Sequence, residues 1–248
     1  MKRTLKVLSA LLTYPTKEMT DAVPEFRAAL VEEDCLAKKD RRPLELLLHQ
    51  LETLGLYDLQ ERYGLLFDRT RSLSLHLFEH VHGESRDRGQ AMVDLQQLYE
   101  QRGLDVSTTE LPDFIPLFLE FLSTIPENEA RDLLEEPLHV LEAIRLRLKK
   151  RRSSYSWVFS ALKALAHAKP MAAAVEALLA EPDPDANDLV ALDAAWEEEE
   201  VRFGPSAGNP GNPTNPMAPD QQAGCSASGS GCGQTAPLNT GNLNPPRI

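Results

Sequence analysis

Prolines divide the leucine-rich part of this chain into segments of helical length, and their positions constrain the fold more than any other feature. A proline lacks a backbone N–H, so it is tolerated in the first turn of a helix but costs about 3 kcal/mol in a helix interior. Each such proline therefore marks the start of a separate helix. Three of the predicted helices are 44–54 after Pro43, 138–150 after Pro137 and 171–179 after Pro170.

The spacing of apolar residues supports the same interpretation. Alternation of β-branched and polar residues, which is typical of strands, is nearly absent. Apolar residues recur instead at the three- and four-residue intervals of a helix face. Further helices are predicted over 5–12, from 59 to about 70, over 85–102 with Gly103 as its stop, over 127–136, over 157–165 with Trp157 on its apolar face, and over 189–196. The sequence thus predicts an all-α fold, a multi-helix globular bundle of about nine or ten helices.

The composition changes abruptly at residue 204. Residues 204–248 hold 8 of the 13 glycines and 8 of the 18 prolines but only two charged side chains, Asp220 and Arg247. A segment with so little apolar side-chain surface cannot form a packed core. We therefore predict one helical domain over residues 1–203 and a disordered tail, rich in Pro, Gly and Asn, over 204–248.

The charge and hydropathy patterns exclude two classes of function. The two charges of the tail cancel, so the predicted domain carries the whole net charge of −12. Binding to nucleic acid requires clustered Lys and Arg in excess, and this chain has the opposite balance. An integral membrane protein needs about 20 consecutive apolar residues, and no run approaches that length.

The N-terminal pattern favours a structural helix over a secretion signal. The apolar run 5–12 is interrupted by Lys6 and Ser9, and Tyr14-Pro15 follows where small residues would be needed for cleavage. Only Cys35 lies in the predicted domain, so a disulfide framework is not expected. Cys225 and Cys232 in the tail lack the spacing of a known metal site and are interpreted as free thiols. Together these features predict a cytoplasmic protein.

A polar stretch precedes the most apolar segment of the chain. Residues 107–113 contain β-branched and acidic residues, and Pro112 disfavours a helical conformation at Leu111. Residues 114–122 are almost entirely apolar. This order predicts a loop that leads into a deeply buried helix. A hinge or groove between two helical lobes that meet near 104–113 is consistent with the same pattern.

The strongest chemical pattern is H-x-x-E-H at His76, Glu79 and His80. On a helix the two histidines share a face, and this arrangement is the inverted zinc-peptidase motif, in which the carboxylate is the general base. Two observations weigh against a zinc-dependent hydrolase: no third ligand is distinguished by its setting, and Gly83 follows His80 closely. A structural histidine cluster or a polar recognition edge is the other interpretation, and both stay open at this point.

Three stretches of the sequence carry a resemblance to one protein family, and the resemblance covers roughly residues 5–180. The opening Leu11-Leu12-Thr13-Tyr14-Pro15 fits, and a later block is Leu111-Pro112-Asp113-Phe114-Ile115-Pro116-Leu117-Phe118-Leu119-Glu120-Phe121-Leu122. The central block comprises Tyr63-Gly64-Leu65-Leu66-Phe67-Asp68 and His76-Leu77-Phe78-Glu79-His80-Val81-His82-Gly83-Glu84-Ser85-Arg86-Asp87-Arg88-Gly89-Gln90-Ala91-Met92. This combination resembles the nitrate reductase molybdenum cofactor assembly chaperones, the delta-subunit (NarJ) branch of the TorD-like redox-enzyme maturation proteins.

The resemblance implies a TorD-like all-helical fold and a chaperone role. Members of this family bind the apo catalytic (alpha) subunit of respiratory nitrate reductase, including its N-terminal segment, permit molybdenum cofactor insertion, and are absent from the finished enzyme. The implied partners are this apo subunit and the proteins that deliver the molybdenum cofactor. No catalytic residue, resident cofactor or metal is expected. The family's E-x-P-x-D-H hinge motif is matched only in part, because Phe114 stands where the histidine is expected, so a role of that histidine is not carried over.

The candidate client-peptide site combines apolar anchors with charged neighbours. An amphipathic client helix requires apolar side chains lining a groove, and the surplus of carboxylates is suited to a basic client N-terminus. For each aromatic residue the alternative is a place in the core. The candidate residues are Tyr63, Phe67, Asp68, His76, Phe78, Glu79, His82, Arg86, Asp87, Arg88, Glu110, Pro112, Asp113, Phe114, Leu117 and Phe118.

Overall fold

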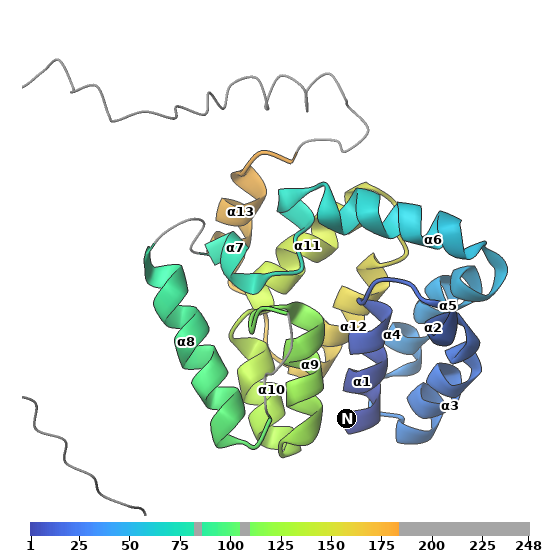
Figure 1. Ribbon diagram of the computed structural model, residues 1–248, viewed down its shortest axis with the longest axis horizontal. Coiled ribbons are helices and arrows are strands. Elements are labelled where there is room, and N and C mark those ends of the chain that lie inside the picture. Colours follow the sequence, from blue (N-terminus) through green and yellow to red (C-terminus); the bar gives the residue numbers. More distant parts are fainter. Residues whose placement is uncertain (82–85, 105–109, 184–248) are drawn as a thin grey trace, which may run out of the picture. The chain divides into compact units, whose positions relative to one another are not determined.

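The structure is a computed structural model that describes residues 1–81, 86–104 and 110–183 (Figure 1). Within these residues the regular elements are helices, and the only β-type pairing is an isolated bridge between His76 and Phe114. The prediction of an all-α fold is therefore confirmed. The elements are α1 (Lys2–Leu11), α2 (Lys17–Asp21), α3 (Val23–Glu33), α4 (Lys38–Arg41), α5 (Leu44–Thr53), α6 (Leu56–Tyr63), a π-helical turn η1 (Gly64–Asp68), a 3₁₀ turn η2 (Arg71–Leu73), α7 (Leu77–Val81), α8 (Arg86–Gln101), α9 (Ile115–Thr124), α10 (Glu127–Glu135), α11 (Leu138–Lys150), α12 (Ser156–Ala166) and α13 (Ala172–Ala180).

The chain divides into two compact units, Met1–Glu200 and Val201–Ile248. The second unit, the predicted tail 204–248 and the predicted helix 189–196 all lie outside the described residues. The boundary near 204 and the disorder of the tail therefore stay predictions.

Several predicted helix boundaries are confirmed. Pro43 and Pro137 stand directly before the first residues of α5 and α11. Gly103 follows the end of α8 with a φ of 82°, a left-handed conformation that glycine adopts without steric cost and that ends many helices. The helix after Pro170 begins one position later than predicted, because Met171 is its N-cap residue.

The number of helices differs from the prediction. The described part of the chain contains thirteen α-helical segments instead of about nine or ten. Three of the additional ones, α2, α4 and α7, have only four or five residues. A single turn presents too few residues for an apolar period to be recognised, so sequence periodicity does not find such helices.

The first helix lies against the most apolar one. α1 packs along α9 and also contacts α3 (Figure 1). Leu5, Leu8 and Leu12 are fully buried in this contact region, as the stripe on 5–12 predicted. The hydroxyl of Ser9 donates a 2.6 Å hydrogen bond to the carbonyl of Pro116, which joins segments 107 residues apart. Residues 105–109 of the predicted hinge lie outside the described residues, so the two-lobe arrangement stays a prediction.

α11 forms the centre of the C-terminal half, with α12 and α13 packed against it. Leu141, Ile144 and Leu148 are buried along its length. The expectation that Trp157 belongs to the apolar face of α12 is wrong, because this side chain is 37% exposed. Val158, Leu162 and Leu165 belong to the buried face, and Trp157, five positions before Leu162, lies off that face.

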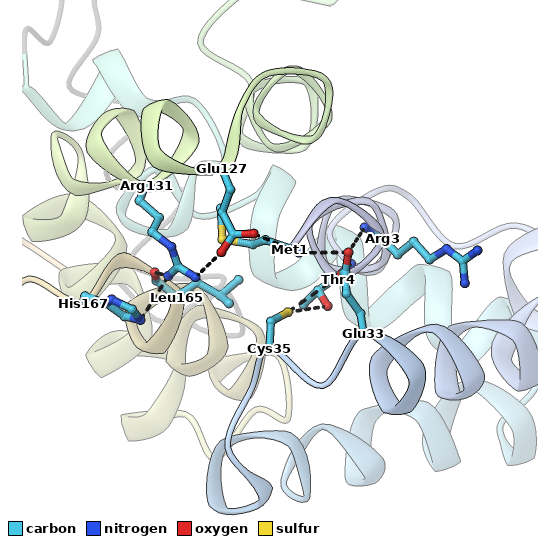
Figure 2. Close-up of polar contacts among 9 residues, drawn as sticks. All are labelled: Met1, Arg3, Thr4, Glu33, Cys35, Glu127, Arg131, Leu165 and His167. Carbon is cyan, nitrogen blue, oxygen red and sulfur yellow. Dashed lines mark hydrogen bonds and ion pairs between the residues drawn. The ribbon is translucent and has the colours of Figure 1, made fainter.

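A polar network joins the start of α1 to α3 and α10 (Figure 2). The amino group of Met1 lies 2.9 Å from a carboxylate oxygen of Glu33 and 3.7 Å from one of Glu127. Glu127 pairs in turn with Arg131 at 2.6 Å. Burial raises the pKa of Glu33, but hydrogen bonds from the Met1 amine and from Thr4 outweigh this effect and lower the pKa to about 2. The network therefore fixes α1 where it packs on α9.

Throughout the described ranges, each helix is either too short or too polar to cross a bilayer.

Candidate functional site

Two of the predicted site residues, Tyr63 and Phe67, lie in an aromatic cluster at the end of α6. Tyr63, Phe67 and Tyr155 are 5%, 7% and 2% exposed, and we call these three residues the aromatic cluster. Phe67 lies with its ring centroid 4.9 Å from that of Tyr63 and 5.1 Å from that of Tyr155. The hydroxyl of Tyr63 donates a 2.9 Å hydrogen bond to the carbonyl of Leu12. These side chains are part of the core, and their predicted contact with a client stays a prediction.

The neighbouring Asp68 has a different environment. It is the last residue of the π-helical turn η1, which continues directly from α6, and its side chain is exposed. Thr70, two residues later, is buried and donates a hydrogen bond to the carbonyl of Leu65 at 3.2 Å. The structure thus has two elements, α6 and the π-helical turn η1, where a single helix from 59 to about 70 was predicted.

Many of the remaining predicted residues lie where the segment before α7 meets the segment before α9. We call residues 74–81 and 111–118 the α7–α9 corner. The backbone N–H of Leu77 donates to the carbonyl of Asp113 at 3.1 Å, and that of Ile115 donates to the carbonyl of Leu75 at 2.8 Å. The hydroxyl of Tyr99, on α8, donates to the carbonyl of Pro112 at 2.8 Å. These bonds bring together two sequence blocks that lie more than 30 positions apart.

Asp113 is the central polar residue of the corner. It is fully buried, yet both of its carboxylate oxygens have partners. One oxygen lies 3.1 Å from Nδ1 of His76, and the other accepts a 3.0 Å hydrogen bond from the backbone N–H of Phe78 in the first turn of α7. Asp113 therefore caps α7 from a distant part of the sequence. The hydrogen bond to Asp113 raises the pKa of His76 above its ordinary value, although burial opposes this effect.

The second histidine of the H-x-x-E-H pattern has the opposite environment. His80 is buried, and its Nε2 lies 2.8 Å from the backbone carbonyl of Ser74. Burial lowers the pKa of His80, and the nearby positive charge of Arg147 lowers it further. A neutral imidazole that donates to a backbone carbonyl is a structural group.

The zinc-hydrolase alternative is not supported by this geometry. His76 precedes α7 instead of lying on it, so the two imidazoles do not share a helix face. The imidazole of His76 is bonded to Asp113 and that of His80 to Ser74, so the two rings are not directed at a common point. Across the described ranges, no group of three or more His, Cys, Asp or Glu side chains is arranged to hold a metal ion.

An apolar cavity of about 190 Å³ opens at the corner, between α7, α8, α9 and the start of α11. Phe78 and Phe118 are the predicted residues that line it. Val81, which is 52% exposed, lies at its edge. The other lining residues are not among the candidates that the sequence indicates. The complete lining is Leu77, Phe78, Val81, Leu95, Phe118, Leu133, Glu136, Pro137, His139 and Val140.

Of the residues that the structure describes, the other predicted ones do not line this cavity. Phe114 and Leu117 are half-buried, and the ring of Phe114 lies 5.3 Å from that of His76. Glu79 forms an ion pair with Arg88 at 3.4 Å. Asp87 and Glu110 are exposed, and Pro112 is buried. His82 and the side chain of Arg86 lie outside the described residues.

Comparison with known proteins shows the family of this chain. The family model described as nitrate reductase delta subunit matches residues 33–161, which is more than half of the chain. The nitrate reductase molybdenum cofactor assembly chaperone NarJ of Escherichia coli (strain K12) is 43% identical over 199 residues, which cover 80% of this chain and 84% of that protein. The probable nitrate reductase molybdenum cofactor assembly chaperone NarW of the same strain is 40% identical, over 80% of this chain and 83% of its own.

More distant proteins match as well. A probable nitrate reductase molybdenum cofactor assembly chaperone NarJ of Bacillus subtilis (strain 168) is 33% identical over 65% of this chain and 86% of its own. A solved structure of a candidate redox enzyme maturation protein from Archaeoglobus fulgidus aligns with 66% of this chain and 91% of its own, at 22% identity and a TM-score of 0.49. From the family model and the identity to the Escherichia coli proteins, we conclude that this chain belongs to the nitrate reductase delta subunit family.

Proposed function

We propose that this protein is a non-catalytic chaperone that binds the apo catalytic subunit of a respiratory nitrate reductase, including its N-terminal segment, and holds it until the molybdenum cofactor has been inserted. The proposal rests on the apolar cavity at the α7–α9 corner in a chain of this family. The relatives are named as assembly chaperones, which agrees with a function in binding and not in chemistry. The proposal includes a cytoplasmic location and contact with the proteins that deliver the cofactor.

The size of the cavity suits one anchor residue of a client helix. An apolar cavity of about 150 Å³ holds a benzene molecule, so about 190 Å³ accepts one large apolar side chain. Burial of such a side chain contributes about 1.5–3 kcal/mol. Flanking contacts along the half-buried Phe114 and Leu117 would add the remainder needed for micromolar binding, about 8 kcal/mol in total.

The charges around the cavity favour a basic client segment. Glu136 lines the cavity, and the exposed Asp87 and Glu110 lie on the segments that flank it. The chain as a whole carries a net charge of −12. An acidic surface attracts a basic segment and raises its rate of association, most strongly at low salt.

A peptide-binding experiment tests the proposal. A fluorescently labelled peptide from the N-terminus of the nitrate reductase catalytic subunit is titrated with the full chain, and its anisotropy is measured. We expect saturable binding with a dissociation constant in the micromolar range or below. Val81→Asp should weaken binding at least tenfold, because a carboxylate at the edge of an apolar cavity would be desolvated by the bound anchor residue.

Val31→Asp is the matched control. Val31 is 57% exposed and lies near the C-terminal end of α3, as Val81 does in α7, but it does not line the cavity. The two substitutions therefore change the same charge in similar helical positions. Equal weakening by both variants, or the absence of saturable binding to the unaltered chain, would show that the cavity is not the client site.

A further inference from the structure

A second cavity, separate from the α7–α9 corner, lies between α6 and the loop that joins α11 to α12. Its volume is about 650 Å³, within the range of small-molecule sites. Three arginines, Arg62, Arg151 and Arg152, line it together with Ser153 and Ser154. In a chain with a net charge of −12, such a concentration of guanidinium groups in one cavity needs an explanation.

The helix dipole explains only part of it. The last turn of α11 and the two residues after it read Lys149-Lys150-Arg151-Arg152. Positive side chains at a helix C-terminus are stabilising, because they interact with the negative end of the helix dipole. That effect acts on any basic residue in the last turn and does not require one to lie past the helix end, facing a cavity.

The backbone at Arg152 gives the more specific observation. The N–H of Arg152 donates to the carbonyl of Lys149, and the N–H of Ser153 donates to the carbonyl of Leu148, both at 3.0 Å. This is the hydrogen-bond pattern of a Schellman turn, in which the residue with positive φ is usually glycine. Arg152 has a φ of 55° and so holds a strained conformation that glycine would adopt freely. The turn itself gains nothing from this arginine.

The other donors of the cavity are already oriented. Oε1 of Gln50 accepts a 3.2 Å hydrogen bond from Arg62 and a 2.5 Å hydrogen bond from the hydroxyl of Ser154. The guanidinium of Arg62 has five N–H groups, and this bond uses one of them. Arg151 is held at the cavity by an ion pair with Asp183 at 2.6 Å. The positive groups thus come from two separate elements and face one space.

The other residues that line the cavity differ from the arginines in character. Leu65 and Leu66 supply apolar surface, and Asp58 and Glu61, on α6, supply carboxylates. These carboxylates would repel a second anionic group but can accept hydrogen bonds from O–H or N–H groups. A fitting ligand therefore has one compact anionic end and an uncharged body with hydrogen-bond donors.

We propose that this cavity binds a small organic phosphate, with the phosphate held by Arg62 and Arg152 and the hydroxyl-bearing body lying toward Asp58 and Glu61. A phosphate offers three acceptor oxygens to the planar, multiply donating guanidinium groups, and such pairs are among the strong hydrogen bonds of proteins. The cavity is too large for a bare phosphate ion, so the organic body is part of the recognition.

The experiment is calorimetric titration of the full chain with D-ribose 5-phosphate, inorganic phosphate and ribose. We expect saturable binding of both phosphates at one shared site, with ribose 5-phosphate at least threefold tighter, and no binding of ribose. Arg152→Gly should weaken the binding of ribose 5-phosphate at least tenfold. The same substitution relieves the positive φ, so the midpoint of thermal unfolding should be unchanged or higher, and a loss of binding is then not a loss of fold.

Lys149→Ala is the matched control. Lys149 is exposed and belongs to the same basic run, but it does not line the cavity, so its removal should change the affinity less than threefold. Equal weakening by both variants would show nonspecific charge attraction and overturn the proposal. So would a lack of saturable binding of either phosphate, or binding of an acidic peptide in their place. Arg152 does not line the cavity of the α7–α9 corner, so Arg152→Gly should leave the affinity for the client peptide unchanged. Either proposal can therefore fail without the other.

Discussion

The aromatic cluster and the α7–α9 corner have similar sequences but different structures. Both contain aromatic residues at helical spacing with carboxylates beside them. In the cluster, the rings contact one another and the Tyr63 hydroxyl is bonded to a backbone carbonyl of the segment after α1. In the corner, Asp113 holds the backbone of α7, and the side chains of Phe78 and Val81 line an open cavity.

The difference shows what separates a core residue from a residue of the proposed client site. The rings of the aromatic cluster pack on one another and the Tyr63 hydroxyl has a backbone partner, so the cluster contributes to stability. In the corner, the buried Asp113 fixes two chain segments, whereas the apolar side chains of Phe78 and Val81 stay partly exposed. A binding surface of this kind needs a rigid polar support beneath it, because a cavity whose walls move loses part of its affinity to ordering.

The largest expected effect comes from removing a ring of the aromatic cluster. Phe67→Ala should lower the free energy of unfolding by about 3–5 kcal/mol, because it deletes a large buried side chain and leaves a cavity that its neighbours fill only in part. Urea denaturation followed by circular dichroism measures this loss. Client-peptide affinity, measured under conditions where the variant is folded, should change less than threefold.

Phe78→Ala is the counterpart in the corner. Phe78 is only half-buried, so its truncation should lower the free energy of unfolding less than the truncation of Phe67 does. It should lower the affinity for the client peptide more. The comparison between the two regions fails if the two variants show the same ratio of lost stability to lost affinity.

The second effect concerns the support of the corner. Asp113→Ala removes the carboxylate that caps α7 and pairs with His76. We expect a loss of about 2–3 kcal/mol, since hydrogen bonds to a charged group contribute about 1.5–3 kcal/mol and a cap about 1 kcal/mol. Proton NMR titration of the His76 ring should show its pKa falling when the carboxylate is absent.

Glu110→Ala gives the control for this change. It removes a carboxylate from the same loop, but the side chain is exposed. Its effect on unfolding should stay within about 0.5 kcal/mol. If the Asp113 variant were no less stable than the Glu110 variant, the corner would not depend on a buried cap.

Much of the fold follows from local sequence signals. Pro43 and Pro137 mark helix starts because a missing N–H is harmless only in the first turn, and Gly103 marks a helix end because the turn there requires a positive φ. The apolar run after Phe114 correctly predicts a buried helix, α9. The expectation for Trp157 fails because Trp157 lies five positions before Leu162, which is not a helix-face interval; the buried face of α12 begins with Val158 instead.

The site was less predictable, because its geometry depends on contacts between distant residues. His76 and His80 have the spacing of neighbours on a helix, yet α7 begins only at Leu77, where Asp113 caps it from another segment. No local pattern contains that partner. For the same reason Tyr63 and Phe67 could not be separated from Phe78 by sequence: whether an aromatic side chain is covered depends on which helix packs over it.

The smallest expected effect is a pH dependence that has opposite signs at the two histidines of the corner. The hydrogen bond to Asp113 raises the pKa of His76, so the stability that its charged form contributes is fully present below the unfolded-state value of about 6.5 and is lost as the pH rises through the folded-state value. Burial lowers the pKa of His80, so the stability contributed by its neutral form is fully present above about 6.5 and is lost as the pH falls through the folded-state value.

Two variants separate these contributions. His76→Asn should destabilise the protein more at about pH 5.5 than at about pH 8.5, and His80→Asn should do the reverse, because each removes the group whose favoured form predominates in that range. Urea denaturation at the two pH values gives both differences, and a pKa change of one unit corresponds to only about 1.4 kcal/mol. Differences of the same sign for both variants would mean that the two imidazoles share one environment, as a common metal site would require, and would remove the distinction between the residue that supports the corner and the one buried beneath it.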